Sequence, residues 1–376
     1  MKTSNSKKLF IFSLIAAAFA CFALFPASVA AGAVIKMTIP STFTCADLLV
    51  TQAKAEAIWA DNAENAEYVP ESVALQAIVE NQTAKLAPIT GLQEKNNSMK
   101  IIWLTNCDLD VTDASGECFP DGPEPKSNCK TVQPTFTREV PFQINEDDLR
   151  NAIYSKEEVL ARRLLMVLKT LDEDIAAKAV AFLEDNEGVN AYAGIGTVTG
   201  GTVGNSYTTV APANWTAAIN GYLYQVAKKN RFASPYLVNG SNLFQANWNA
   251  EMDAANADGK GNLNKFRSLK TYWDLFNIDG AFANPSSFLI DRSAVFFGGL
   301  WRYSEGVTDY GSDVGKRYSI QSRTVPGLRY DVHYIVKCVN DEVIHKFKVI
   351  ARGGFYLNPT GCTETNTHVL RFSNES

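Results

Sequence analysis

Apolar residues recur every three or four positions along residues 156–185, and charged residues fill most of the positions between them. The apolar positions are Leu160, Leu164, Leu168, Leu171, Ile175, Ala179, Phe182 and Leu183. This spacing puts them on one face of a helix. Ser155 and Glu158 have capping-box spacing at its start, and Asn186 and Gly188 stand at its end. We therefore predict one helix of about 30 residues, well above the usual length.

The acidic cluster Asp172–Glu173–Asp174 lies within this helix. Carboxylates in such a cluster could ligate a metal ion. We interpret the cluster instead as part of the solvated helix face, because surface helices are charged on the side away from the core.

The C-terminal third of the chain has the period of two that is typical of strands. Three such segments cover residues 317–325, 330–339 and 343–357. In the second, Val332, Tyr334, Val336 and Cys338 share one face. We expect His333 and His345 to be exposed strand residues rather than metal ligands or acid–base groups.

The middle of the chain alternates short helices and strands. Helical spacing covers about 46–65, 68–81 and 214–230, a strand is predicted at 99–104, and 235–244 has a strand–turn–helix pattern. The glycine-rich stretch 194–210 fits neither G-x-G-x-x-G nor the P-loop pattern, so we interpret it as a flexible loop or hairpin tip.

One acid and one base stand side by side in the apolar run SFLIDRSAVFFGGL at 287–300. Asp291 and Arg292 either do chemistry in a cleft or fix the end of a strand. We favour the structural interpretation, in which Asp291 caps the turn after the strand and Arg292 reaches an acid or a subunit contact.

Composition narrows the function classes. The chain has 376 residues, is 46% hydrophobic and 20% charged, and carries a formal net charge of −5. It can fill a sizeable core, and no strongly basic nucleic-acid-binding surface is implied. Only His333, His345 and His368 are histidines, and no catalytic motif is present. We expect no catalytic, cofactor-binding or metal site.

The N-terminus has the anatomy of a secretory leader. Three lysines precede an apolar run from Leu9 to Phe25, and Pro26 and small residues follow. We predict a signal peptide or removable hydrophobic leader at 1–31.

Six cysteines lie beyond the predicted leader, and an even number in an exported chain suggests disulfides. They are Cys45, Cys107, Cys118, Cys129, Cys338 and Cys362. We expect at least one bridge among the three central cysteines or from them to Cys45, and we expect that Cys338 and Cys362 can close the final hairpin. Sequence alone leaves the connectivity open.

The order of these elements resembles the major capsid proteins of tailed bacteriophages, a fold shared with encapsulins. The resemblance covers roughly 37–360 and rests on the long helix, the excursion before it, FLIDRSAVFF at 288–297 and KFKVIARGGFYLNP at 346–359. It implies an α+β, two-domain fold with an N-terminal arm, an extended hairpin loop, a spine helix and a β-rich C-terminal part.

The resemblance also implies domain boundaries. They are a leader at 1–31, an arm at 32–84, the cysteine-bearing extended loop at 85–140, the spine helix of a peripheral domain at 141–193, an axial α/β domain at 194–310, and the β-rich remainder of the peripheral domain at 311–376.

The implied function is that of a self-assembling structural shell subunit located in a virion. Its partners would be copies of itself and packaged nucleic acid bound without sequence specificity, and it would meet a membrane only through the leader. An export leader departs from the family pattern.

Two alternatives stay open at this point. One is a secreted or cell-surface, adhesin-type binding protein stabilised by disulfides, for which the leader, the cysteines and four Asn-x-Ser/Thr sequences argue. Those sequences begin at Asn81, Asn96, Asn214 and Asn239. The other is a secreted hydrolase dependent on Asp291.

Overall fold

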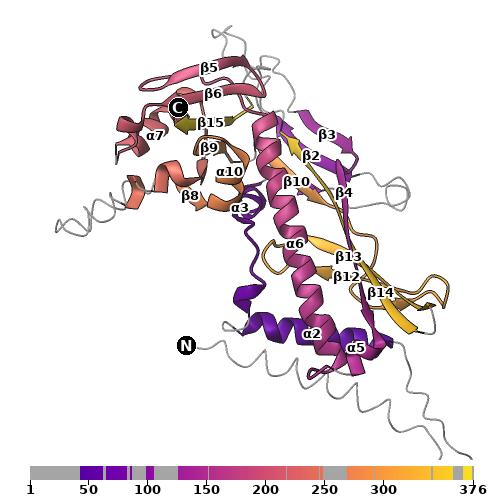
Figure 1. Ribbon diagram of the computed structural model, residues 1–376. Helices are drawn as coiled ribbons and strands as arrows, with labels where there is room; N and C mark the ends of the chain where they lie inside the picture. The colour runs from indigo at the N-terminus through magenta and orange to yellow at the C-terminus, as the bar shows by residue number, and fades with distance from the viewer. Residues whose placement is uncertain are drawn as a thin grey trace, which may run out of the picture. The chain divides into compact units, whose positions relative to one another are not determined.

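The computed structural model describes most of the chain after the predicted leader. The described residues are 43–61, 65–82, 85–86, 99–105, 126–150, 152–216, 218–244, 246–248, 269–292, 294–339, 342–358 and 367–374. They form a mixed α+β structure, as predicted (Figure 1). The leader at 1–31 lies outside the described residues. None of the described helices combines the length and the apolar composition that crossing a membrane requires.

The long helix is present as predicted. Helix α6 runs over Lys156–Asp185, 30 residues, and the Ser155 hydroxyl accepts a hydrogen bond from the Glu158 backbone N–H at 3.3 Å. Seven of the eight predicted apolar positions are buried, and Phe182 is half-buried. The interpretation of its acidic cluster needs correction, because Asp172 is buried on the core face.

A six-stranded sheet packs against α6. Its path is β10 (Val295–Gly299), β14 (Glu342–Leu357), β13 (Arg329–Val339), β12 (Lys316–Gln321) and β11 (Thr308–Asp309), and β4 (Phe136–Asn145) also pairs with β14. The register aligns Val332 with Val349 and Tyr334 with Phe347. These residues are buried and face α6, because strand residues alternate between the two faces.

A second six-stranded sheet has strands that together span fewer residues, so we call it the smaller sheet and the sheet against α6 the larger sheet. The smaller sheet follows the order β5 (Thr197–Thr202), β6 (Asn205–Val210), β15 (Val369–Asn374), β9 (Ser286–Asp291), β7 (Pro235–Asn239) and β8 (Lys270–Trp273). Helices α7 (Ile219–Lys229) and α10 (Leu275–Ala281) belong to this part of the chain, with the short turn η2 (Pro212–Asn214) before α7. Leu223 and Val226 of α7 pack with Leu289 and Phe372 of the sheet in a core of their own.

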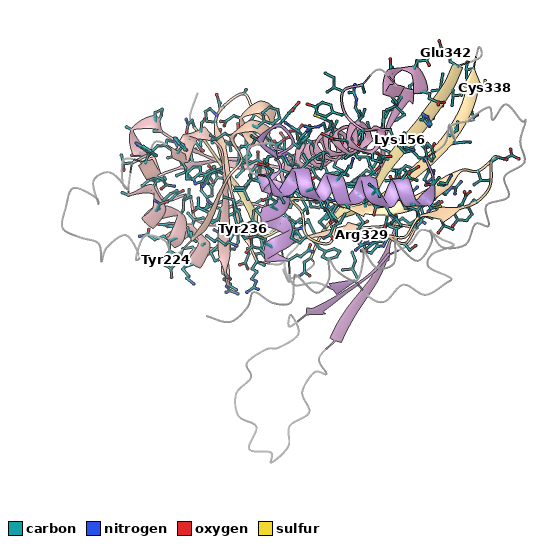
Figure 2. The ribbon with its side chains drawn as sticks, turned by 90° about the horizontal axis from the view of Figure 1, so that it is seen from below. Lys156, Tyr224, Tyr236, Arg329, Cys338 and Glu342 are labelled. Atoms are coloured by element: carbon teal, nitrogen blue, oxygen red, sulfur yellow. The ribbon has the colours of Figure 1, made fainter. Side chains whose placement is uncertain are left out.

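The predicted extended loop contains a three-stranded sheet of β1 (Lys85–Leu86), β2 (Met99–Thr105) and β3 (Lys126–Val132). Its root lies on the larger sheet, where Ile101 and Val132 pack against Phe296 and Leu300. From this root β2 and β3 project beyond the other strands (Figure 2).

The N-terminal helices pack against α6. Helix α2 (Cys45–Ala60) packs Ala55 and Ile58 against Ala161 and Leu165 of α6. The short turn η1 (Asn65–Glu67), α3 (Val73–Asn81) and, after β4, the short helix α5 (Glu146–Arg150) complete this part.

The two sheets do not divide the chain at the predicted boundary at 310, and the domain boundaries stay predictions. Strand β10, at 295–299, joins β14, while the last strand, β15, pairs with β9 and β6. The chain thus crosses from one sheet to the other after Asp291 and returns before Val369. Hydrophobic period identifies a strand but does not tell which sheet it joins, so the sequence alone missed both crossings.

Candidate functional site

Asp291 lies where the chain leaves one sheet for the other. It is the last residue of β9 and is 7% exposed. Its carboxylate accepts hydrogen bonds from the backbone N–H groups of Ser234 at 2.8 Å, Arg292 at 3.0 Å and Ala233 at 3.1 Å. The side chain of Arg292 is exposed. The Asp291 side chain therefore ties the start of the crossing to the segment before β7.

The predicted disulfide cysteines are only partly described. Cys45 and Cys338 are free thiols. Cys107, Cys118 and Cys362 lie outside the described residues, and only the backbone of Cys129, in β3, is described. Cys338 lies at the tip of the β13–β14 hairpin, beside Glu342 in Figure 2. The bridges that would use Cys45 or Cys338 are not formed in this structure, and those among the other four stay predictions.

A buried carboxylate joins α6 to the larger sheet. Asp172, 2% exposed, accepts hydrogen bonds from the hydroxyls of Ser322 at 2.9 Å and Thr324 at 3.1 Å, and from the hydroxyl of Tyr330. Burial raises the pKa of Asp172 to about 6, although the three hydroxyls act in the opposite direction. The helical period gave one signal for this residue, because position 172 lies four residues after Leu168 and three before Ile175, which are both buried.

A second buried acid joins the end of α6 to the smaller sheet. Glu187 is 2% exposed and forms an ion pair with Arg371 of β15 at 3.0 Å. Burial raises the pKa of Glu187 to about 7, while Arg371 lowers it. The Arg371 guanidinium also lies 4.5 Å from the ring centres of both Tyr207 and Phe282. These contacts fix the smaller sheet to the C-terminal end of the helix.

The two strand histidines differ from the prediction. His345 is 3% exposed and its Nδ1 lies 2.9 Å from the Tyr334 hydroxyl, and the ring of Phe43 packs edge-on against it at 5.0 Å. His333 is half-buried against Tyr303 on the opposite face of the sheet. The prediction of exposure was wrong because the arm residue Phe43 covers His345, and no local pattern reveals a cover so distant in sequence.

Large apolar side chains are exposed in adjacent or stacked pairs at four places along the chain. They are Leu49 and Val50 on α2, Ile153 and Tyr154 before α6, Phe244 and Trp248 after β7, and Leu275 and Phe276 on α10. Ile153 is 98% exposed and Phe276 is 65% exposed. Phe244 and Trp248 are stacked with their ring centres 6.2 Å apart. Exposed apolar groups that cluster mark contact surfaces more often than scattered ones do.

The described residues bring together no group of three or more His, Cys, Asp or Glu side chains that could hold a metal ion. One hollow of about 220 Å³ lies beside β10 and is lined by Val79, Gln82, Phe296, Phe297, Gly299, Trp301, Pro326, Gly327 and Leu328. None of these side chains is ionisable, so this hollow offers contact area rather than acid–base chemistry.

No protein-family model matches the sequence, and no curated protein matches it significantly. Several solved structures are similar in fold at low identity. The capsid of a native GTA particle is 14% identical with a TM-score of 0.45, and the match covers 82% of this chain and 92% of that one.

The capsid of cyanophage A-1(L) is 12% identical with a TM-score of 0.42, over 73% of this chain and 87% of that one. The SrpI encapsulin of Synechococcus elongatus is 7% identical with a TM-score of 0.38, over 76% and 83%. These three similar structures are thus two capsids and an encapsulin.

Proposed function

We propose that this protein is a self-assembling structural subunit of a closed, phage-capsid-like shell. The observation that carries the proposal is the set of four exposed apolar pairs on α2, before α6, after β7 and on α10. A subunit of a closed shell touches neighbours on several sides, and repeated head-to-tail contacts between unlike patches build such assemblies. Apolar pairs exposed at several places along the chain suit this task better than one pair would.

The projecting three-stranded sheet supports the same function. It leaves the larger sheet at Ile101 and Val132 and extends away from the compact part of the chain (Figure 2). A two- or three-stranded ribbon with little core of its own gains stability by lying on another surface. In an assembly, the neighbouring copy supplies that surface.

The partners of this protein in the proposed function are copies of itself, and its location is the virion. Packaged nucleic acid would be held without sequence specificity, and a membrane would be met only through the predicted leader. No catalysis and no cofactor are part of the proposed function.

No described feature favours the adhesin-type alternative. Two of the six cysteines that motivated it, Cys45 and Cys338, are free thiols. Of its four Asn-x-Ser/Thr sequences, the one at Asn239 is fully buried and closed to glycan attachment.

The proposal is tested by comparing the wild type with variants of the exposed pairs in sedimentation velocity. We expect Ile153→Ser combined with Phe276→Ser to shift the protein from large particles to small species, with an unchanged circular dichroism spectrum. The single exposed Val203, at 38% exposure in the β5–β6 hairpin, provides the control Val203→Ser. Particle formation by the double variant equal to that of the control would contradict the proposal.

A further inference from the structure

Phe43, at the N-terminal limit of the described chain, is enclosed by aromatic side chains. It is 1% exposed, and its ring centre lies 5.7 Å from that of Tyr334, 5.0 Å from that of His345 and 5.9 Å from that of Phe347. All three contacts are edge-on. Phe43 thus anchors the N-terminal end of the described residues.

Two consecutive hydrogen bonds connect Phe43, Tyr334 and His345. The Phe43 backbone N–H donates to the Tyr334 hydroxyl oxygen at 2.9 Å, and that hydroxyl lies 2.9 Å from Nδ1 of His345. Among the hydrogen bonds of the described residues, Nδ1 of His345 is the only group that can accept the Tyr334 hydroxyl hydrogen, so we assign Tyr334 as the donor to His345. This direction requires Nδ1 to carry a lone pair, as it does in the neutral imidazole with its proton on Nε2.

We propose that these two hydrogen bonds form an acid-sensitive latch on the start of α2. Protonation of His345 opens the latch and releases Phe43 and the first turn of the helix. A proton on Nδ1 turns the acceptor into a donor, and the Tyr334 hydrogen is left without its partner in a buried site. The proposal does not depend on the shell function.

Charged groups of α2, α5, α6 and β12 act on this site. Lys156 of α6 has its Nζ 5.3 Å from the centre of the Phe43 ring and forms an ion pair with Asp47 of α2 at 2.9 Å. Lys316 of β12 has its Nζ 5.7 Å from the centre of the Tyr334 ring, and the charge of Glu146 of α5 acts on His345.

These surroundings set the direction of the pH effect. Burial lowers the pKa of His345, Glu146 raises it, and Lys156 lowers it, for a net lowering. Because the pKa of His345 is lower in the folded protein than in a free histidine, His345 stabilises the closed latch fully above about pH 6.5. This stabilisation is lost as the pH falls below that value.

The opening should stay local. Further along α2, Ala55 and Ile58 are held by Ala161 and Leu165 of α6, a contact without ionisable groups. The capping box of Thr44 and Asp47 lies next to the latch and loses its anchor when Phe43 leaves. Residues 43–51 should therefore loosen before the rest of the helix.

Hydrogen exchange measured by mass spectrometry on the full-length chain tests the latch. Protection of residues 43–51, corrected for intrinsic exchange, is compared at about pH 7.5 and about pH 5. We expect the wild type to lose protection roughly threefold or more at the lower pH. We expect His345→Asn, which keeps an acceptor near the Nδ1 position and does not titrate, to show no such loss.

The control is His333→Asn, on the opposite face of the same sheet, which should behave as the wild type does. Equal protection of the wild type at both pH values, or the same loss in His345→Asn, would overturn the proposal. If His345→Asn does not fold, Phe43→Ala decides. We expect it to show the acid level of protection already at about pH 7.5, and wild-type protection there would equally overturn the latch.

Discussion

The carboxylate of Asp172, in the middle of a 30-residue helix, accepts a hydrogen bond at 2.9 Å from the hydroxyl of Ser322, at the end of a strand 150 positions away. Thr324 and Tyr330 donate to the same carboxylate. One buried acid thus holds the long helix against the β12–β13 turn. Its protonation state should be visible in the stability of the whole domain.

The first prediction concerns pH. Burial raises the pKa of Asp172 to about 6 from an ordinary value of 3.8. Between these two pH values the folded state keeps a proton on Asp172 that the unfolded state has released. The contribution of Asp172 to the free energy of unfolding is therefore greatest below about pH 4. It falls by roughly 2–3 kcal/mol as the pH rises to about 6 and above. Asp172→Asn should lack this loss.

Chemical denaturation across that pH range measures the effect. Glu187, whose pKa burial raises to about 7, titrates in both proteins, so the difference between wild type and variant isolates Asp172. A wild type and variant with parallel pH profiles would show that Asp172 does not titrate as described.

The second prediction concerns the crossing between the sheets. Asp291→Ala removes the acceptor of three backbone N–H groups and should lower the free energy of unfolding by about 3 kcal/mol, because buried donors left unpaired are costly. Arg292→Ala, at an exposed side chain, should change it by no more than about 0.5 kcal/mol. Equal effects of the two substitutions in thermal or chemical denaturation would refute the capping role.

The third prediction uses two glycines of one turn. Gly315 has φ +79°, and an added Cβ would lie 2.1 Å from the Tyr334 carbonyl oxygen, whereas Gly311, at φ +94°, has nothing within 4 Å of that position. In both alanine variants the left-handed backbone lowers the free energy of unfolding by about 1 kcal/mol. Only Gly315→Ala adds a clash with backbone, so its loss of stability should exceed that of Gly311→Ala by about 1–3 kcal/mol.

Much of the fold was predictable because it depends on local period. The helix over 156–185, the paired strands β13 and β14 and the strand–turn–helix after Pro235 all follow from spacing and turn residues. The resemblance to capsid proteins rested on the order of the same elements, so it too needed no long-range contact.

What the sequence missed depends on partners far along the chain. Asp172 was assigned to the solvated face because its three hydroxyl donors lie about 150 residues away, and His345 was expected to be exposed because Phe43 covers it from the other end of the chain. The run at 288–297 is two strands, β9 and β10, in different sheets. A buried polar network or a change of sheet has no periodic signature.

The central claim is that copies of this chain form a closed shell, and electron microscopy of the purified full-length protein tests it most directly. The account predicts hollow particles of uniform diameter, which dissociate in the Ile153→Ser and Phe276→Ser double variant. A wild-type protein that stays monomeric at every concentration measured, in sedimentation as well as on the grid, would contradict it.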